Sequence, residues 1–150
     1  MGMDIYGRNP KTKPPGDRAY RDCQTEEERE AYWKWQDSAP GAYFRSNIWG
    51  WGPLLQFIDA AVAASRLGFD TSHWGYNDGH GLETQEDCTA LADAMEALLP
   101  KVRAKDWTEP TEIAVAFGTA FGIALDSTLD VERVQRFITF LRHCGGFEIC

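Results

Sequence analysis

The segment 43–55, YFRSNIWGWGPLL, most constrains how this chain can fold, because an extended pattern changes there into a helical one. If residues 43–49 form a strand, their side chains alternate between two faces. Pro53 follows two glycines and suits the first position of a helix, and Gly68 suits the position after a helix end. The sequence therefore predicts a strand over 43–49 and then a helix between Pro53 and Gly68.

Two further helices are indicated by capping pairs. Thr25 and Glu28 form a capping-box pair at the start of one predicted helix. Thr84 and Asp87 start another, which Pro100 ends or restarts. The apolar positions expected to face inward in this second helix are Cys88, Leu91, Ala92, Met95 and Leu98.

The last predicted helix begins near residues 127–130 and ends at Gly145. Its apolar face repeats with helical spacing. The positions on this face are Val134, Phe137, Ile138 and Leu141. The segment 107–125 fits strand and helix patterns equally well, and its alanine content favours a helix.

Short strand patterns stand near both ends of the chain. Met3 and Ile5 alternate with Asp4 and Tyr6, and the segment 147–149 alternates in the same way. Pairing the N-terminal, central and C-terminal strands gives a small sheet that about four helices cover on one face. We therefore expect a two-layer α+β fold, formed by residues 1–150 as a single domain.

The composition limits the possible partners. A formal net charge of -8 opposes binding to the backbone of nucleic acids, although fifteen Lys and Arg leave room for a local basic pocket. The four cysteines lack the spacing of a zinc site, and the start of the chain has no signal-peptide core. The longest weakly polar run, 113–125, is shorter than the roughly 20 residues that span a bilayer. We expect a cytoplasmic, reduced protein without a membrane partner.

One face of the central strand combines groups that stack on and hydrogen-bond a planar or anionic ligand. It carries Tyr43, Arg45, Asn47 and Trp49. One hypothesis is that this face, with Trp74 and Asn77 from the loop HWGYNDGHGL, lines a shallow pocket for a nucleotide-like anion. In the other interpretation the aromatic rings pack, and Arg45 pairs with a carboxylate such as Asp4.

Asp78 and His80 in the same loop suit acid–base chemistry, or metal binding with His73 as a third ligand. Metal binding requires His73 and His80 to converge across the turn. In the alternative, Asp78 caps its own turn and His80 is only exposed. Because the chain has no GxSxG, HExxH, GxxxxGK[ST] or GxGxxG motif, we predict no catalytic residue, metal or cofactor. Asp78 and His80 are instead assigned to ligand binding.

Four segments together resemble a family of uncharacterised small proteins from phages, prophages and bacterial genomes: MGMDIYGRNP, AYFRSNIWGWGPLL, WGYNDGHGL and FLRHCGGFEIC. The chain departs from the family pattern at Ser46, where the pattern has Asn, and at Gly52, where it has Arg before Pro. Many relatives look as if they carry a Cys-rich, zinc-type insert before the last helix. Residues 107–125 have no such insert, so the resemblance does not imply zinc here.

The resemblance implies an accessory protein of a phage or mobile element, a class that often acts against host defences. We therefore expect a non-enzymatic binding protein whose partner is a host protein or a small nucleotide-like ligand in the host cytoplasm. Its two versions are a blocker of a defence protein, such as an anti-CRISPR protein, and a sponge for a nucleotide signal. The alternative is a small hydrolase or nucleotide-modifying enzyme that uses Asp78 and His80.

Overall fold

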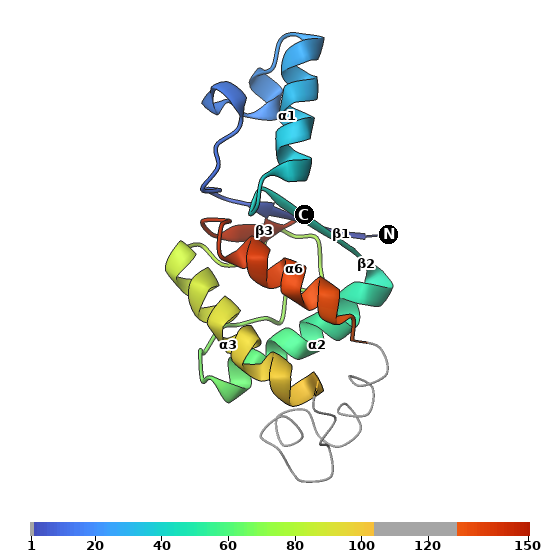
Figure 1. Cartoon of the computed structure of the whole chain (residues 1–150), viewed down its shortest axis with the longest axis vertical. Helices are drawn as coiled ribbons and strands as arrows, with labels where there is room; N and C mark the ends of the chain where they lie inside the picture. Colours follow the sequence, from blue (N-terminus) through green and yellow to red (C-terminus); the bar gives the residue numbers. More distant parts are fainter. Residues whose placement is uncertain (1, 104–128) are drawn as a thin grey trace.

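The chain folds as a small sheet with helices packed beneath it. The computed structural model describes residues 2–103 and 129–150, and within these ranges it contains a three-stranded antiparallel sheet and four α-helices. Three of the helices gather under one face of the sheet, and the other helix stands beyond the opposite face (Figure 1). The predicted α+β fold is therefore confirmed.

The N-terminal strand occupies the middle of the sheet. The strands are β1 (Gly2–Gly7), β2 (Tyr43–Asn47) and β3 (Phe147–Ile149). They lie in the order β2-β1-β3, so that Ile5 of β1 lies opposite both Phe44 and Ile149. These three side chains are buried against the helices. β2 and β3 are the two edges of the sheet.

The three helices under the sheet supply most of the core. They are α2 (Ile48–Ala64), α3 (Gln85–Arg103) and α6 (Val131–Leu141). On α6, the ring centroid of Phe137 lies 5.0 Å from that of Phe44 and 6.1 Å from that of Phe147. The apolar faces predicted for α3 and α6 are buried as expected: Cys88, Leu91, Ala92, Met95, Leu98, Val134, Phe137, Ile138 and Leu141. Removing these side chains from water is the main stabilising contribution to the fold.

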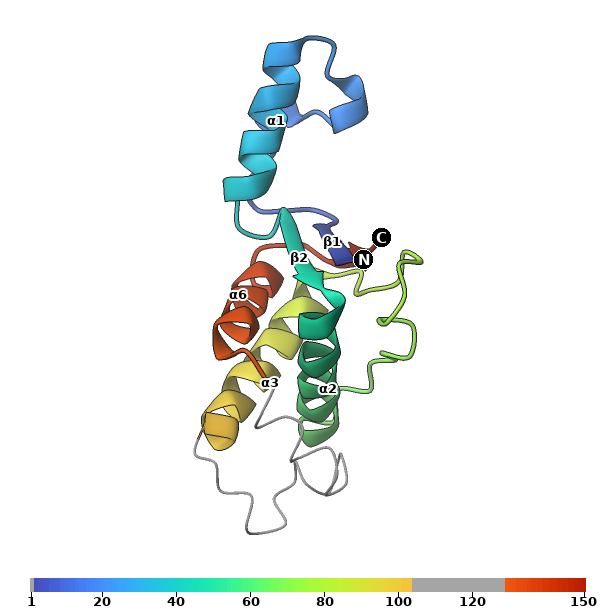
Figure 2. The ribbon, with the colours of Figure 1, turned by 90° about the vertical axis from the view of Figure 1, so that its right-hand side faces the viewer.

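The long connection between β1 and β2 forms a projecting arm. Its elements are η1 (Pro15–Asp17), η2 (Tyr20–Asp22) and α1 (Glu26–Ser38). α1 begins with the predicted capping box between Thr25 and Glu28. Aromatic side chains of the arm pack on one another, and their ring centroids lie between 4.9 and 6.2 Å apart. Figure 2 shows that the arm extends away from the helices that form the core.

The boundary between β2 and α2 differs from the one predicted. β2 ends at Asn47 rather than at Trp49, because the Asn47 side chain accepts a hydrogen bond from the Gly50 N–H (2.8 Å). This bond caps the helix. α2 therefore begins at Ile48, and Pro53 lies inside the helix rather than at its first position.

Other predicted limits were also wrong. α3 continues through Pro100 to Arg103, so Pro100 lies inside the helix and does not end it. α6 ends at Leu141, before the predicted limit at Gly145, which has φ +64° and belongs to the following turn. The segment 107–125 lies outside the described residues. Within the described ranges, no helix has both the length and the apolar character needed to cross a bilayer.

The contact of Gly41 with the C-terminal turn gives a test of this packing. Gly41 has φ +79°, and an added Cβ would lie 2.3 Å from the carbonyl carbon of His143, whereas Gly68 has φ +70° and open space. We expect Gly68→Ala to lower the free energy of unfolding by about 1–2 kcal/mol, the cost of a left-handed backbone. Gly41→Ala should cost at least about 3 kcal/mol, because steric overlap adds to that cost. Urea denaturation measures both losses, and equal losses would contradict the close contact.

Candidate functional site

Hydrogen bonds show which backbone groups of β2 point outward. In an antiparallel ladder, hydrogen-bonded and non-hydrogen-bonded residue pairs alternate. The Gly7 N–H donates to the Ala42 carbonyl (3.0 Å), so the next hydrogen-bonded position on this strand, Phe44, directs its N–H and carbonyl toward β1. The N–H and carbonyl groups of Tyr43 and Arg45 therefore point away from the sheet.

The two edges of the sheet differ in how they are covered. On the outer side of β3, the Phe147 N–H donates to the Leu82 carbonyl (2.7 Å), and the Ile149 N–H donates to the His80 carbonyl (3.0 Å). Among the described residues, no hydrogen bond reaches the backbone N–H and carbonyl groups of Tyr43 and Arg45, whereas the Asn47 carbonyl accepts one from the Ser46 hydroxyl (3.1 Å). β2 is therefore the open edge, and an open edge is a template for pairing with another strand.

A groove with a volume of about 490 Å³ lies beside this open edge, between β2 and α6. Phe44 and Phe140 contribute apolar surface to it, and the guanidinium of Arg136 lies 5.7 Å from the centroid of the Phe44 ring. The charged residues of the lining are Asp37, Arg45, Glu132 and Arg136. The two phenylalanines are almost fully buried, so the accessible lining of the groove is marked mainly by charges of both signs.

Two side chains of β2, on the face of the sheet away from the core helices, interact with Asp4 of β1. The Tyr43 hydroxyl donates to the Asp4 carboxylate, and the Arg45 Nε lies 3.5 Å from the same oxygen. Partial burial, followed by the bond to Asp4, raises the pKa of Tyr43 to about 12. Arg45 therefore pairs with a carboxylate, as one of the two interpretations of the sequence predicted. Its side chain is still 66% exposed, so it presents a charge at the groove.

Large apolar side chains are exposed where β2 runs into α2. Trp49 is 85% exposed and Ile48 is 54% exposed. Both follow directly after Asn47, whose side chain is committed to capping α2. Adjacent exposed apolar side chains of this size are typical of interaction surfaces. They extend the surface beside the open edge at the C-terminal end of β2.

The loop residues predicted to join this surface take two different positions. Trp74 is 1% exposed, and its carbonyl accepts a hydrogen bond from the Trp51 indole N–H (2.8 Å), so the Trp74 ring belongs to the core. Asn77 donates to the Gly2 carbonyl at the start of β1 (3.3 Å). The structure thus places along β2 and the start of α2 four of the predicted residues, Tyr43, Arg45, Asn47 and Trp49.

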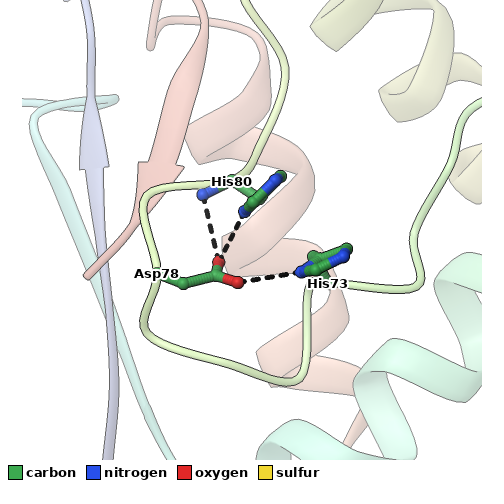
Figure 3. A group of neighbouring side chains, drawn as sticks. All are labelled: His73, Asp78 and His80. Carbon is green, nitrogen blue, oxygen red and sulfur yellow. Dashed lines mark hydrogen bonds and ion pairs between the residues drawn. The ribbon is translucent and has the colours of Figure 1, made fainter.

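His73, Asp78 and His80 form a second candidate site (Figure 3). The Asp78 carboxylate lies 2.9 Å from His73 Nδ1 and 2.8 Å from His80 Nδ1. The two imidazole rings stack with their centroids 4.2 Å apart and their planes at 22°. The histidines therefore converge across the turn, as a metal site would require. Asp78 also accepts a hydrogen bond from the His80 N–H (3.3 Å), so it caps its own turn as well.

The α6 side of the groove was missed by sequence reasoning. Its exposed residues, on the side of α6 opposite the buried face, are Glu132, Gln135, Arg136 and Thr139. The helical period of the sequence places these residues together. It does not show that β2 lies beside them, because the two elements are far apart along the chain.

The histidines should make Asp78 an unusually strong acid. The hydrogen bond from His73 is the main cause that lowers the pKa of Asp78 to about 2, from an ordinary value of 3.8. A carboxyl group whose pKa folding lowers adds stability above its unfolded pKa, and this stability disappears as the pH falls through the folded pKa. The contribution should therefore be lost between about pH 4 and pH 2.

We expect NMR titration of the Asp78 carboxyl carbon to give a midpoint near 2 in the native protein and one closer to 3.8 in a His73→Ala/His80→Ala variant. In an Asp78→Asn variant, the part of the acid-induced decrease in the free energy of unfolding that comes from Asp78 should be absent. Urea denaturation across this pH range measures it. A native midpoint at the ordinary value would contradict the geometry of the cluster.

Comparison of the chain with protein-family models, with curated proteins and with solved structures found no match. The resemblance to phage-type proteins therefore stays a prediction. The function has to be inferred from the chemistry of the two candidate sites.

Proposed function

We propose that this chain is a non-enzymatic binding protein that captures an extended segment of a partner protein along the open edge of β2. The observation that carries the proposal is the open edge at Tyr43 and Arg45 beside a groove of about 490 Å³. A bound segment would hydrogen-bond the outward backbone groups as an additional strand. Its alternate side chains would then enter the groove.

Backbone pairing alone does not account for specific binding. The N–H and carbonyl groups of Tyr43 and Arg45 offer four hydrogen bonds, and at about 1 kcal/mol net for each bond they contribute about 4 kcal/mol. A micromolar complex requires about 8 kcal/mol. Side chains around the edge must supply the difference and thereby select the partner.

The surface beside β2 contains side chains suited to this role. Arg45 and Arg136 line the groove and suit an acidic side chain of the bound segment. Trp49 suits an apolar anchor at the end of the strand, because exposed tryptophans often dominate binding energy in interfaces. The expected ligand is an extended segment with apolar residues alternating with charged ones.

The resemblance to phage-type proteins supports a host protein as the partner. Of the two versions of the expected function, it favours a blocker of a defence protein. The geometry lends less support to a nucleotide-like ligand, because the Trp74 ring, which was expected to line its pocket, is buried in the core. The net charge of -8 also favours a protein partner over a nucleic acid.

A small hydrolase or nucleotide-modifying enzyme is the second candidate, and one observation favours it. Asp78 holds His80 through Nδ1, which leaves the other ring nitrogen for proton transfer, as in enzymes where a carboxylate orients a histidine base. Asp78→Asn and His80→Ala separate the two candidates. These changes remove the acid–base pair but leave the edge of β2 unchanged, so they should not affect capture of a peptide.

Arg45→Pro tests the proposal, because it removes one outward N–H from an edge strand, where proline is tolerated. Peptides of 12 residues, displayed as a random library, would be selected on the immobilised native protein and their affinities measured by fluorescence anisotropy. We expect Arg45→Pro to weaken binding at least about tenfold. The variant loses one backbone hydrogen bond to the peptide, and the proline ring also disturbs the contact with the peptide backbone. Trp49→Ala should weaken it about fivefold or more.

Arg45→Ala is the matched control, since it removes the same charge but keeps the N–H. It should weaken binding less than Arg45→Pro does. NMR shift mapping on the native protein gives a second measurement if Arg45→Pro unfolds, because the amides of Tyr43 and Arg45 should shift when a peptide is added. The proposal fails if selected peptides leave these amides unshifted, or if a folded Arg45→Pro variant binds like Arg45→Ala.

A further inference from the structure

We infer that His73, Asp78 and His80 bind a divalent transition-metal ion of the zinc type. Each of these side chains offers one ligand atom, and the three atoms lie within 4.8 Å of one another. This site is separate from the open edge of β2. The inference goes beyond the proposed capture of a peptide and does not depend on it.

The donor set determines the class of ion. Two imidazole nitrogens and one carboxylate suit zinc and neighbouring first-row metals, whereas magnesium and calcium prefer oxygen ligands alone. Both Nδ1 atoms face the Asp78 carboxylate, so Nδ1 is the coordinating nitrogen in this arrangement. Three protein ligands leave a tetrahedral ion one position for water or another small ligand.

The distances are compatible with an ion between the three groups. Zinc bonds to nitrogen and oxygen of about 2.1 Å place tetrahedral ligand atoms roughly 3.4 Å apart. The present nitrogen–oxygen distances are 2.8 and 2.9 Å. Each nitrogen–oxygen pair therefore has to open by about 0.5 Å, and the two ring nitrogens, which lie within 4.8 Å of each other, have to settle at a similar spacing. The ion takes the place of the protons between Nδ1 and the carboxylate, so binding releases protons.

The loop that carries the donors is fixed at both ends. His73 precedes Trp74, whose ring is buried in the core. On the other side, the Gly79 N–H donates to the Ile149 carbonyl (2.8 Å), and the Ile149 N–H donates to the His80 carbonyl (3.0 Å). Ligands held in place before binding lose less entropy when the ion arrives. This attachment to β3 distinguishes the cluster from exposed side chains that are close only by chance.

Metal uptake would be measured by isothermal titration of the full chain with zinc chloride. All four cysteines are free, and Cys150 is the exposed one, so a Cys150→Ser background removes a competing thiol. We expect one zinc ion per chain. Alanine at His73, Asp78 or His80 should weaken binding at least about a hundredfold, the upper end of what the loss of a supporting outer contact usually costs. Magnesium chloride should give no binding.

His143→Ala is the matched control, because His143 is the third histidine and bonds to the Thr139 carbonyl on α6 (2.8 Å). This variant should bind zinc as the native protein does. In the native protein, zinc should shift the NMR signals of the ring nitrogens of His73 and His80 but not of His143, which tests the site without any variant. Absence of zinc binding at millimolar concentration, binding that His143→Ala abolishes, or unshifted His73 and His80 rings would overturn the inference.

Discussion

The pairing of β1 with both neighbouring strands determines which backbone groups at the edges of the sheet are available for binding. β1 pairs with both neighbours, and backbone groups alternate in direction along each strand. The Cys150 N–H donates to the Asp4 carbonyl (2.8 Å), so Phe147 and Ile149 turn their backbone groups to the far side of β3. Residues 79–82 pair with three of those groups, and the Arg8 side chain donates to the fourth, the Phe147 carbonyl (3.1 Å). The corresponding groups of Tyr43 and Arg45 on β2 have no such cover among the described residues.

The same arrangement produces both candidate sites. The segment that covers β3 carries His80 and follows Asp78, so closing one edge of the sheet also fixes the cluster of His73, Asp78 and His80. The open edge of β2 lies next to α6, and the groove lies between them. The exposed Trp49 adds an apolar side chain just beyond the C-terminal end of β2. A protein-binding surface and a metal site can therefore exist on opposite sides of one small sheet without sharing a residue.

Much of the fold was predictable because its signals are local. The capping pair Thr25/Glu28 and the apolar spacing on α6 act within single helices, and both predictions are confirmed. Ile48 and Trp49 were wrongly assigned to the strand, because the extended dihedral angles of the capping residue Asn47 do not show in the sequence where the helix begins. Trp74 was assigned to a surface pocket because its neighbours are polar, although long-range packing buries it. The groove was not predictable, since it joins β2 to α6 across most of the chain.

The most direct test of this account is amide hydrogen exchange of the free protein, followed residue by residue with NMR. Open-edge N–H groups exchange without disruption of the sheet, whereas paired groups require local opening. We predict rapid exchange at Tyr43 and Arg45, with much slower exchange at Phe44 on the same strand and at Phe147 and Ile149 on the covered edge. Protection of Tyr43 and Arg45 equal to that of Phe44 would show that the β2 edge is already occupied, and would contradict the central claim.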